Sequence, residues 1–287
     1  MTIEESQPKK PTYWLCGKYQ LELSHPLIMG ILNVTPDSFS DGGRFTSATQ
    51  AIEAAQLMIE QGADIIDVGG ESTRPGSDEV APSEELSRVL PVVEELALRN
   101  IVVSVDTRHA EVARACVEAG ASIINDVSGF RDPAMVEVAK GSDAGLVVMH
   151  MLGEPKGMQV APQYKDVVRD ISRYLCGQAQ MLEEAGIAHE RICIDPGPGF
   201  GKTTDHNLSL LRATHRLSAL GWPLMVAISR KRFVGEITGV SQARERVVGS
   251  VTGACYAVAQ GAAIARVHDV AATVQAFRML RAIQEAS

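Results

Sequence analysis

The chain has 287 residues, of which 45% are hydrophobic and 22% charged, and its formal net charge is -8 at pH 7. This composition can bury a large apolar core, and the length suits a single α/β barrel domain. The acidic balance and the lack of a dense Lys/Arg run argue against a protein that binds nucleic acid or an anionic membrane, so small molecules are the expected partners.

The first segment in chain order, residues 1–12, is polar, and we expect it to be a flexible N-terminus. It contains no apolar stretch followed by a small-residue cleavage site, so no secretory signal is predicted. Residues 12–25 are expected to form a short N-terminal hairpin. This hairpin would close the bottom of a single domain that spans residues 13–285.

Beyond the hairpin, short apolar runs rich in Val and Ile are predicted strands: 27–34, 64–69, 101–105, 121–127, 145–150, 191–195, 223–228 and 263–267. Segments with helical periodicity alternate with them: 47–61, 83–99, 109–119, 133–140, 166–186, 207–220, 243–260 and 270–285. Near-continuous apolar strands imply burial on both faces, as in a parallel sheet. The repeats therefore predict an α/β fold, namely a single-domain (β/α)8 TIM barrel.

An open doubly wound sheet is the alternative architecture for alternating strands and helices. No G-x-G-x-x-G turn follows the first predicted strand, and the sequence gives no sign of a break in strand order. These two observations favour the barrel.

Most predicted strands end at a residue that can carry charge or make a directed hydrogen bond: Asn33, Asp67, Asp106, Asn125, His150, Asp195, Ser229, and Arg266 with His268. Any single Asp or Asn in this position could simply cap the following helix. Arg266 and His268 cannot be N-caps, so capping does not explain the whole series. In a barrel the strand ends converge on one face, which is where active sites of this fold are built.

Two long loops follow the first two predicted strands, at residues 32–45 and 69–80, and loops of this length on the active face usually cover or bind a ligand. A Gly-rich turn, DPGPGFGK, occupies residues 195–202. Its spacing is not that of a P-loop, so its glycines are interpreted as allowing the backbone to bend close to a ligand.

The candidate site has two chemical halves. Asp106, Asn125 and Asp195 suit the donor and acceptor edge of a flat nitrogen heterocycle, because a carboxylate can accept two parallel N–H bonds. Lys231, Arg266 and His268 suit phosphate. They belong to the segments SRKR at 229–232 and RVHD at 266–269, after the seventh and eighth strands, where barrels commonly bind phosphate.

The five cysteines form no C-x-x-C pair and have no clustered histidines with zinc-ligand spacing: Cys16, Cys116, Cys176, Cys193 and Cys255. No apolar run is long enough to cross a bilayer. We therefore expect a protein of a reducing compartment, the cytoplasm.

Several ordered motifs together resemble the dihydropteroate synthase family over roughly residues 27–283. They are GILNVTPDSFSDGG at 30–43, DVGGESTRPG at 67–76, SVDT at 104–107, NDVSG at 125–129, VMHM at 148–151, DPGPGFGK at 195–202, SRK at 229–231 and RVHD at 266–269. The resemblance implies an enzyme that joins 6-hydroxymethyl-7,8-dihydropterin pyrophosphate to p-aminobenzoate. It also implies a homodimer formed through the last helices.

The resemblance assigns roles to individual residues of this chain. The pterin would be bound by Asp106, Asn125, Asp195 and Lys231, and the pyrophosphate with Mg²⁺ by Asn33, Arg266 and His268, with Asn33 as the metal ligand. The p-aminobenzoate pocket would contain Phe39, Thr73, Arg74, Pro75 and Phe200, together with Lys231. Asp41 would face the cationic pterin, and the catalytic set would be Asp41, Lys231, Arg266 and His268.

The implied mechanism is dissociative. Pyrophosphate leaves the pterin methylene first, its developing charge is stabilised by Arg266, His268 and Mg²⁺, and the aromatic amine then attacks the cation. An aniline nitrogen is a weak nucleophile, so the task of the enzyme is to generate the electrophile and exclude water.

The chain departs from the common family pattern at three places. Arg232 follows Lys231 where many members carry a Ser that helps bind the p-aminobenzoate carboxylate, so Arg232 could either supply that charge or point to solvent. Gly157 replaces a frequent Thr, and Ala227 with Ile228 replaces a small polar pair. The last two changes are expected to alter packing only.

Two other functions are alternatives for a barrel with such a site. A corrinoid-linked methyltransferase barrel would not need Arg266, His268 or the SRK segment. A non-catalytic paralogue would be signalled by loss of Asn33, Asp41, Arg74, Lys231 or Arg266, and all of these are present.

Overall fold

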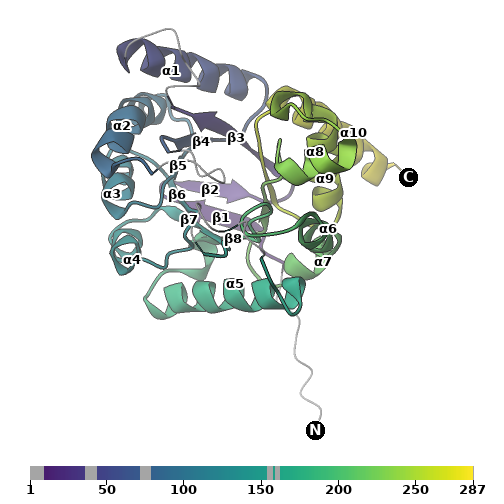
Figure 1. Cartoon of the computed structure of the whole chain (residues 1–287). Helices are drawn as coiled ribbons and strands as arrows, with labels where there is room; N and C mark the ends of the chain where they lie inside the picture. The colour runs from purple at the N-terminus through teal and green to yellow at the C-terminus, as the bar shows by residue number, and fades with distance from the viewer. Residues whose placement is uncertain (1–9, 36–43, 72–78, 154–157, 159–161, 287) are drawn as a thin grey trace.

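The computed structural model describes residues 10–35, 44–71, 79–153, 158 and 162–286 (Figure 1). Of the N-terminal segment expected to be flexible, residues 1–9 lie outside the described part, so that expectation stays a prediction.

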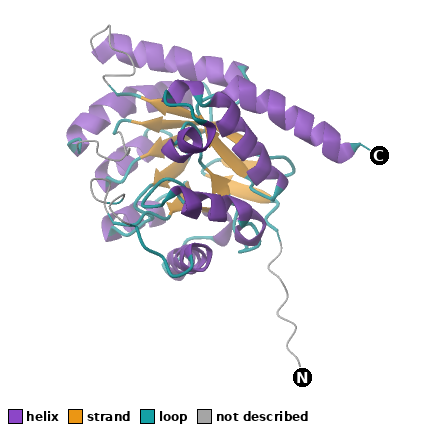
Figure 2. Cartoon of the chain, turned by 45° about the vertical axis from the view of Figure 1, so that its right-hand side comes forward, coloured by secondary structure: helices purple, strands orange, loops and turns teal. Residues whose placement is uncertain are grey.

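Parallel strands form a barrel at the centre of the molecule (Figure 2). They are β3 (Leu27–Asn33), β4 (Ile65–Gly69), β5 (Val103–Asp106), β6 (Ile123–Asp126), β7 (Gly145–Met149), β8 (Ile192–Asp195), β9 (Met225–Val226) and β10 (Ile264–Val267). Their order is β8-β7-β6-β5-β4-β3-β10-β9. A parallel bridge between Ile194 and Leu224 joins the two outer strands and brings the sheet close to full closure. The predicted barrel is confirmed, and the open doubly wound sheet is wrong.

The helices lie outside this ring, as Figure 1 shows. They are α1 (Arg44–Glu60), α2 (Pro82–Leu98), α3 (Ala110–Glu118), α4 (Pro133–Lys140), α5 (Val167–Glu184), α6 (Thr204–Arg212), α7 (Thr214–Leu217), α8 (Arg232–Thr238), α9 (Val247–Ala259) and α10 (Val270–Glu285), with short 3-10 turns η2 (His189–Arg191) and η3 (Ala243–Glu245). Because each strand is covered by helices on its outer face and by packed side chains inside, the strands are mostly apolar, and their polar residues lie mainly toward the carboxyl ends.

Three elements differ from the sequence-based prediction. The helix predicted at 207–220 is two helices, α6 and α7, which meet at Ala213. The seventh strand is only two residues long, and the short helix α8 follows it. A helix of seven residues is too short to give a clear periodic signal, and no Gly or Pro marks the break at Ala213.

The N-terminal hairpin consists of β1 (Tyr13–Cys16) and β2 (Tyr19–Glu22), which pair antiparallel. Trp14 is fully buried, and its indole Nε1 donates a hydrogen bond of 2.9 Å to the carbonyl of Arg191. Trp14 and Cys16 form one apolar cluster with residues from seven of the barrel strands: Leu27, Met29, Ile65, Ile123, Val147, Cys193, Met225 and Ile264. The hairpin therefore closes the N-terminal end of the barrel, as predicted.

Register sets the height of the polar residues at the other end. Asn33 pairs with Gly69, Gly69 with Asp106, and Asp106 with Asn125, so these residues share one level at the carboxyl ends of β3 to β6. Asp67 pairs with Ser104 and lies two residues below that level on β4. The closed end of the barrel supplies stability, and the open end presents the polar side chains.

Replacing Trp14, the hairpin residue that closes the N-terminal end of the barrel, should destabilise the fold. Trp14→Ala removes a fully buried indole and leaves the Arg191 carbonyl without its donor, so we expect a loss of about 3–5 kcal/mol in the free energy of unfolding. Urea unfolding followed by circular dichroism measures it. Leu98→Ala, at a side chain that is 79% exposed, is the control and should change stability by less than about 0.5 kcal/mol. If the Trp14→Ala variant were as stable as this control, Trp14 would not stabilise the closed end of the barrel.

Candidate active site

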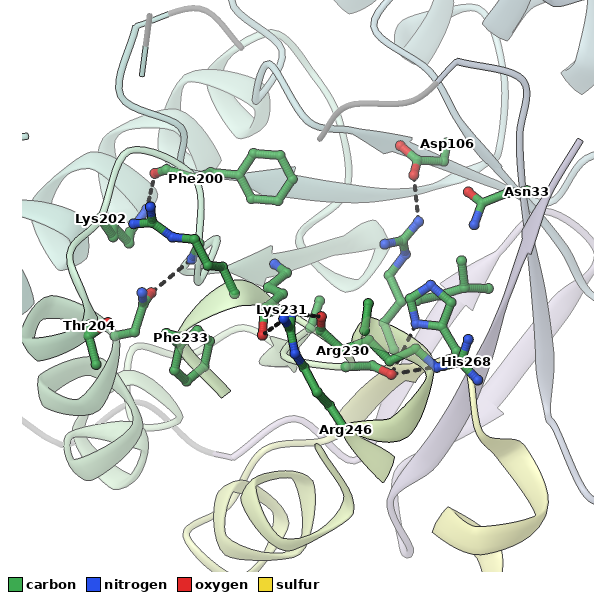
Figure 3. Close-up of a pocket in the computed structure, with 18 of the residues that line it drawn as sticks. Asn33, Asp106, Phe200, Lys202, Thr204, Arg230, Lys231, Phe233, Arg246 and His268 are labelled. Atoms are coloured by element: carbon green, nitrogen blue, oxygen red, sulfur yellow. Dashed lines mark hydrogen bonds and ion pairs between the residues drawn. The ribbon is translucent and has the colours of Figure 1, made fainter. Parts of the chain in front are cut away.

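A cavity of about 400 Å³ opens at the carboxyl ends of the strands. Its wall contains six of the site residues predicted from the sequence: Asn33, Asp106, Phe200, Lys231, Arg266 and His268. Figure 3 shows Asp106, Asn33 and His268 on one side and Phe200 and Lys231 on the other. The structure therefore brings residues from five different strand ends or loops into one pocket, which lies where the fold places its active sites.

Arg266 lies between two buried carboxylates. Its Nε donates to Asp67 Oδ2 at 2.5 Å, and its Nη2 donates to Asp106 Oδ2 at 2.5 Å. Burial lowers the pKa of Arg266, but the two carboxylates outweigh burial and raise that pKa above its ordinary value. The guanidinium is therefore a permanent cation at the floor of the cavity.

Asp106 has the strongest resolved shift among the carboxyl groups that line the cavity. Burial raises its pKa to about 7, against the lowering effect of Arg266, and the nearby Asp67 charge raises it further. Its second oxygen, Oδ1, is buried and has no hydrogen-bond partner among the described residues. A buried carboxylate oxygen without a donor is costly, and an N–H group of a ligand would satisfy it.

Asn125 and Asp195 are buried beside the cavity and are not part of its wall in this structure. Asn125 Nδ2 donates to Asp67 Oδ2 at 3.2 Å. Asp195 Oδ1 accepts from the Gly197 backbone N–H at 2.7 Å, and burial raises the pKa of Asp195, opposed mainly by the charge of Lys231. Asp195 is thus coupled through its charge to Lys231, which lines the cavity, whereas Asn125 contacts Asp67, which does not. The ligand contacts of Asn125 and Asp195 stay predictions.

Lys231 lies at the boundary between the two halves of the pocket. Its Nζ donates to the Pro198 carbonyl and lies 4.6 Å from the centre of the Phe200 ring. Burial lowers the pKa of Lys231 to about 7, although the charge of Asp195 raises it. A lysine so placed can contact both a polar ring edge and an aromatic face.

His268 is oriented by the hydroxyl of Ser229. Ser229 Oγ accepts the backbone N–H of His268 at 3.1 Å and lies 3.0 Å from its ring Nδ1. When the hydroxyl donates to Nδ1, the other ring nitrogen, Nε2, carries the hydrogen. Next to them, Arg230 Nη2 pairs with Asp269 at 2.5 Å, which ties the ends of β9 and β10 together.

The turn 195–202 is held by protein contacts. Lys202 is buried, and its Nζ donates to the Phe200 carbonyl at 2.9 Å and to the His150 carbonyl at 3.2 Å, with His150 Nδ1 at 3.0 Å. Gly197 has φ 62°, and a Cβ there would lie 2.1 Å from the His150 carbonyl oxygen. The close approach that this glycine permits is thus to strand β7. The result is a fixed position for Phe200.

His150 and Lys202 illustrate how burial suppresses charge in this region. Burial, followed by the Lys202 charge, lowers the pKa of His150 to about 3, and burial lowers the pKa of Lys202 well below its ordinary value. His150 also packs edge-on against Tyr174, with ring centres 4.9 Å apart. His150 is thus packed and hydrogen-bonded, and it is not part of the cavity wall.

Arg232 lines the cavity but is largely exposed to solvent. Its side chain is 69% exposed, and its Nε lies 3.2 Å from Glu236 Oε1, one turn along α8. Glu236 also accepts a hydrogen bond from Thr204. Of the two options for Arg232, this structure favours the solvent-facing one, at the rim of the cavity.

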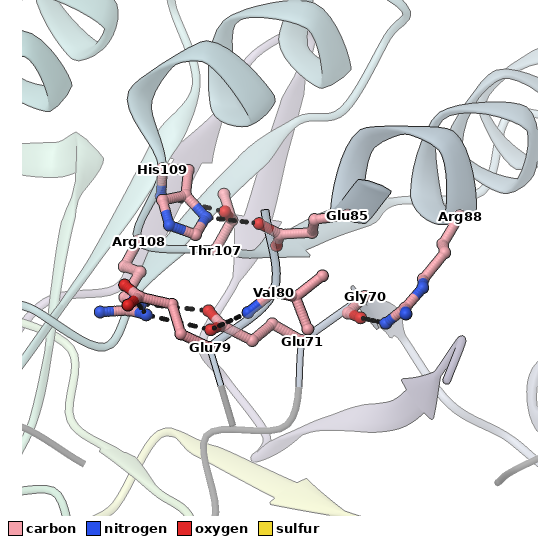
Figure 4. A network of polar contacts seen from close by, with 9 residues as sticks. All are labelled: Gly70, Glu71, Glu79, Val80, Glu85, Arg88, Thr107, Arg108 and His109. Atoms are coloured by element: carbon pink, nitrogen blue, oxygen red, sulfur yellow. Dashed lines mark hydrogen bonds and ion pairs between the residues drawn. The ribbon is translucent and has the colours of Figure 1, made fainter. Parts of the chain in front are cut away.

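A second polar network lies at the stem of the loop that follows β4 (Figure 4). Arg108 Nη2 donates to Glu71 at 3.0 Å and to Glu79 at 2.7 Å, and Glu71 also accepts the backbone N–H of Val80 at 3.2 Å. Glu71, Glu85 and His109 offer ligand atoms within 4.8 Å of one another. Arg108 already pairs with Glu71, and His109 Nδ1 lies 2.7 Å from Glu85 Oε2, so protein contacts engage all three side chains, although Glu85 Oε1 has no partner among the described residues.

Several predicted site residues lie outside the described part of the chain: Phe39, Asp41, Thr73, Arg74 and Pro75, and also Gly157. Their roles stay predictions. Conversely, two central residues were not in the predicted site, Asp67 and Lys202. Asp67 was visible as a polar strand end, but only the three-dimensional structure shows that it contacts Arg266.

Comparison with known proteins agrees with this geometry. Residues 29–268 match the family described as pterin binding enzyme. The chain therefore belongs to the pterin-binding enzyme family.

Its similar relatives within that family are dihydropteroate synthases. That of Escherichia coli strain K12 is 49% identical over 265 residues, covering 91% of this chain and 93% of the relative. The Xanthomonas albilineans synthase with 4-aminobenzoic acid superposes with a TM-score of 0.91 at 45% identity, covering 96% of this chain and 99% of that one. The Burkholderia cenocepacia synthase complexed with 7,8-dihydropteroate gives a TM-score of 0.87 at 45% identity, covering 96% and 97%.

The shifted pKa values of Asp106 and Lys231 predict how pterin binding depends on pH. The pKa of Asp106 is raised to about 7, so its carboxylate is lost as the pH falls through 7, while Lys231, whose pKa is lowered to about 7, loses its charge as the pH rises. We expect the affinity for a pterin to be greatest near pH 7 and to fall by up to about tenfold per unit on the acid side. Calorimetric titration across pH measures it.

Asp106→Asn is the control for this assignment. An amide at this position does not titrate, so the acid limb of the affinity profile should disappear in the variant. An unchanged acid limb in Asp106→Asn would show that another group is responsible.

Proposed function

We propose that this chain condenses 6-hydroxymethyl-7,8-dihydropterin pyrophosphate with p-aminobenzoate to give 7,8-dihydropteroate and pyrophosphate. The observation that carries the proposal is the pairing of a buried carboxylate, Asp106, with a permanent cation, Arg266, in one cavity. The carboxylate of Asp106 would accept N–H groups of a pterin, and the guanidinium of Arg266 would bind a pyrophosphate. The relatives crystallised with 4-aminobenzoic acid and with 7,8-dihydropteroate support the same substrates.

The pterin is assigned to the polar half of the site. The unpartnered Asp106 Oδ1 would accept an N–H of the ring, and Asn125 and Asp195 would supply the neighbouring contacts. Lys231, close to Asp195, would donate to the carbonyl edge of the ring. Burial of these groups strengthens each hydrogen bond and selects a ligand that satisfies all of them.

The pyrophosphate is assigned to Arg266, His268 and Asn33. Arg266 would bind phosphate oxygens through its planar set of donors, and His268, with Nδ1 accepting from Ser229, would donate to a phosphate oxygen from Nε2. These groups would stabilise the charge that develops as pyrophosphate leaves.

Mg²⁺ is assigned to the same place. Asn33 contributes one amide oxygen in the cavity wall. The carboxylates of Asp67 and Asp106 are engaged by Arg266, so the protein offers few oxygens of its own. That donor set fits Mg²⁺, which binds through few protein ligands and completes its shell with substrate phosphates and water. When bound, the ion would neutralise charge on the pyrophosphate.

The p-aminobenzoate is assigned to the other side of Lys231. Phe200, held in place by the turn 195–202, offers an aromatic wall beside the lysine Nζ. Phe39, Thr73, Arg74 and Pro75 are proposed to complete this pocket. Asp41 is proposed to face the pterin cation.

The proposed reaction is dissociative. The bond between the pterin methylene and the pyrophosphate oxygen breaks first, and the electron pair leaves with pyrophosphate. The amine nitrogen then bonds to the methylene carbon and loses a proton to solvent. Asp106, Asn125 and Asp195 hold the ring, Arg266 and His268 hold the leaving group, and no protein nucleophile takes part.

Coupled product assays test the function. With the pyrophosphorylated dihydropterin, Mg²⁺ and p-aminobenzoate, we expect dihydropteroate and pyrophosphate to appear together. Lys231→Ala and Arg266→Ala should each reduce turnover at least about 100-fold, because each removes a charged contact to a reacting substrate.

Lys140→Ala, on the exposed part of α4, is the matched control and should keep full activity. Pterin binding without product would support a non-catalytic paralogue. Failure of the wild-type protein to bind a pterin would overturn the site assignment.

We also propose a cytoplasmic homodimer. None of the helices in the described part of the chain is long and apolar enough to span a membrane. All five cysteines are free thiols, which fits a reducing compartment. The dimer is supported by large apolar side chains exposed on neighbouring helices: Val248 and Tyr256 on α9, and Met279 and Ile283 on α10. These two helices pack together at one side of the barrel (Figure 1).

Charges placed on this surface should dissociate the dimer. Val248 and Met279 are 79% and 63% exposed, so Val248→Glu with Met279→Glu should leave the barrel folded but shift it to a monomer in sedimentation velocity. Leu98→Glu, on α2 at the other side of the barrel, should leave the dimer intact. A monomeric wild-type protein would contradict the proposal.

A further inference from the structure

Asp67 contacts both halves of the site without reaching the cavity. Its side chain is 0% exposed and is not part of the cavity wall. One of its oxygens, Oδ2, accepts both from Arg266 Nε at 2.5 Å and from Asn125 Nδ2 at 3.2 Å. A group in this position cannot bind a substrate directly and must act through its neighbours.

The orientation of Arg266 depends on two contacts of different kinds. Asp106 contacts Nη2 and lines the cavity, where its carboxylate is assigned to the pterin. Asp67 contacts Nε from below the cavity. Asp106 contacts Nη2 through Oδ2 and has its other oxygen assigned to the pterin, whereas Asp67 lies outside the cavity wall and contacts only protein groups.

Strand register explains why Asp67 can do this. Asp67 pairs with Ser104, two residues below the level of Asp106, and β3 alone separates β4 from β10, the strand that carries Arg266. The long arginine side chain reaches across the barrel end and its Nε meets Asp67, while its terminal nitrogens stay at the level of the cavity. A guanidinium held at Nε has its plane and direction fixed, so less conformational entropy is lost when it binds an anion.

We propose that Asp67 is the positioning residue for Arg266: from beneath the cavity it holds the guanidinium in the orientation that binds the pyrophosphate group. This role rests on the proposed function, because it assigns Arg266 to pyrophosphate. Asp67 itself touches neither substrate.

A double-mutant cycle tests whether Asp67 acts through Arg266. The affinity for inorganic pyrophosphate with Mg²⁺ is measured by calorimetry for the wild-type protein, Asp67→Asn, Arg266→Ala and the double variant. We expect Asp67→Asn to weaken binding at least about tenfold in the wild-type background and less than about twofold in the Arg266→Ala background. Equal weakening in both backgrounds, or no weakening by Asp67→Asn, would overturn the proposal.

Asp64→Asn is the matched control, since Asp64 precedes the same strand at the closed end of the barrel. There its Oδ2 accepts the Ile28 N–H at 2.8 Å, and the amide oxygen of Asn can keep this bond. The variant should bind pyrophosphate like the wild-type protein. If Asp64→Asn weakened pyrophosphate binding as much as Asp67→Asn does, the effect would come from altering β4 in general. That result would overturn the positioning role of Asp67.

A second variant covers the case in which Asp67→Asn fails to fold. Arg266→Lys keeps the positive charge but cannot bridge two carboxylates with a planar fork, so it should also lose at least about tenfold in pyrophosphate affinity. Wild-type affinity in Arg266→Lys would show that orientation is unimportant and would overturn the proposal. If the wild-type protein binds no pyrophosphate, the proposed function fails; if it binds but the cycle is additive, only the role of Asp67 fails.

Discussion

The pairing of the Arg266 guanidinium with the carboxylates of Asp67 and Asp106 is the interaction on which the site depends. A buried cation or carboxylate alone would be strongly destabilising, so each of these groups makes burial of the others tolerable. The three residues come from β10, β4 and β5, near neighbours in the sheet with only β3 between β10 and β4. Charge pairing thus connects the strand order of the fold to the composition of the pocket.

The rest of the pocket is arranged around that charged centre by contacts that leave little freedom. Ser229 orients His268, and Lys202 fixes the backbone that carries Phe200. A site in which these groups are already held in place loses less entropy on binding, and its fixed dipoles can stabilise a developing charge. The same low-dielectric surroundings raise the pKa of Asp106 to about 7 and lower that of Lys231 to about 7.

Stability and function are separated along the barrel axis. At the closed end, Trp14 and the starts of the strands form a tightly packed apolar cluster. At the open end, buried polar groups such as Asp67 and Asp106 retain oxygens without partners among the described residues, which costs stability. The apolar end offsets this cost, and buried polar groups without protein partners are typical of a surface built to bind a ligand.

The sequence alone determined the barrel, because eight apolar runs alternating with amphipathic helices have few other ways to bury both faces of each strand. It also indicated the chemistry of Asp106, Lys231, Arg266 and His268, whose residue types at strand ends have no simple structural explanation. The short helix α8 and the break between α6 and α7 could not be predicted, since seven residues give no reliable period and Ala213 carries no breaking signal.

Only the tertiary structure decided which polar residues contact one another. Asp67 and Arg266 are 199 positions apart, and their contact arises from strand order and register, which local sequence does not encode. The same holds for Arg232, which sequence left between the ligand and solvent and which the structure pairs with Glu236. Periodicity and residue type are local properties, whereas burial, pKa shifts and pairing of charges depend on neighbours brought together by the fold.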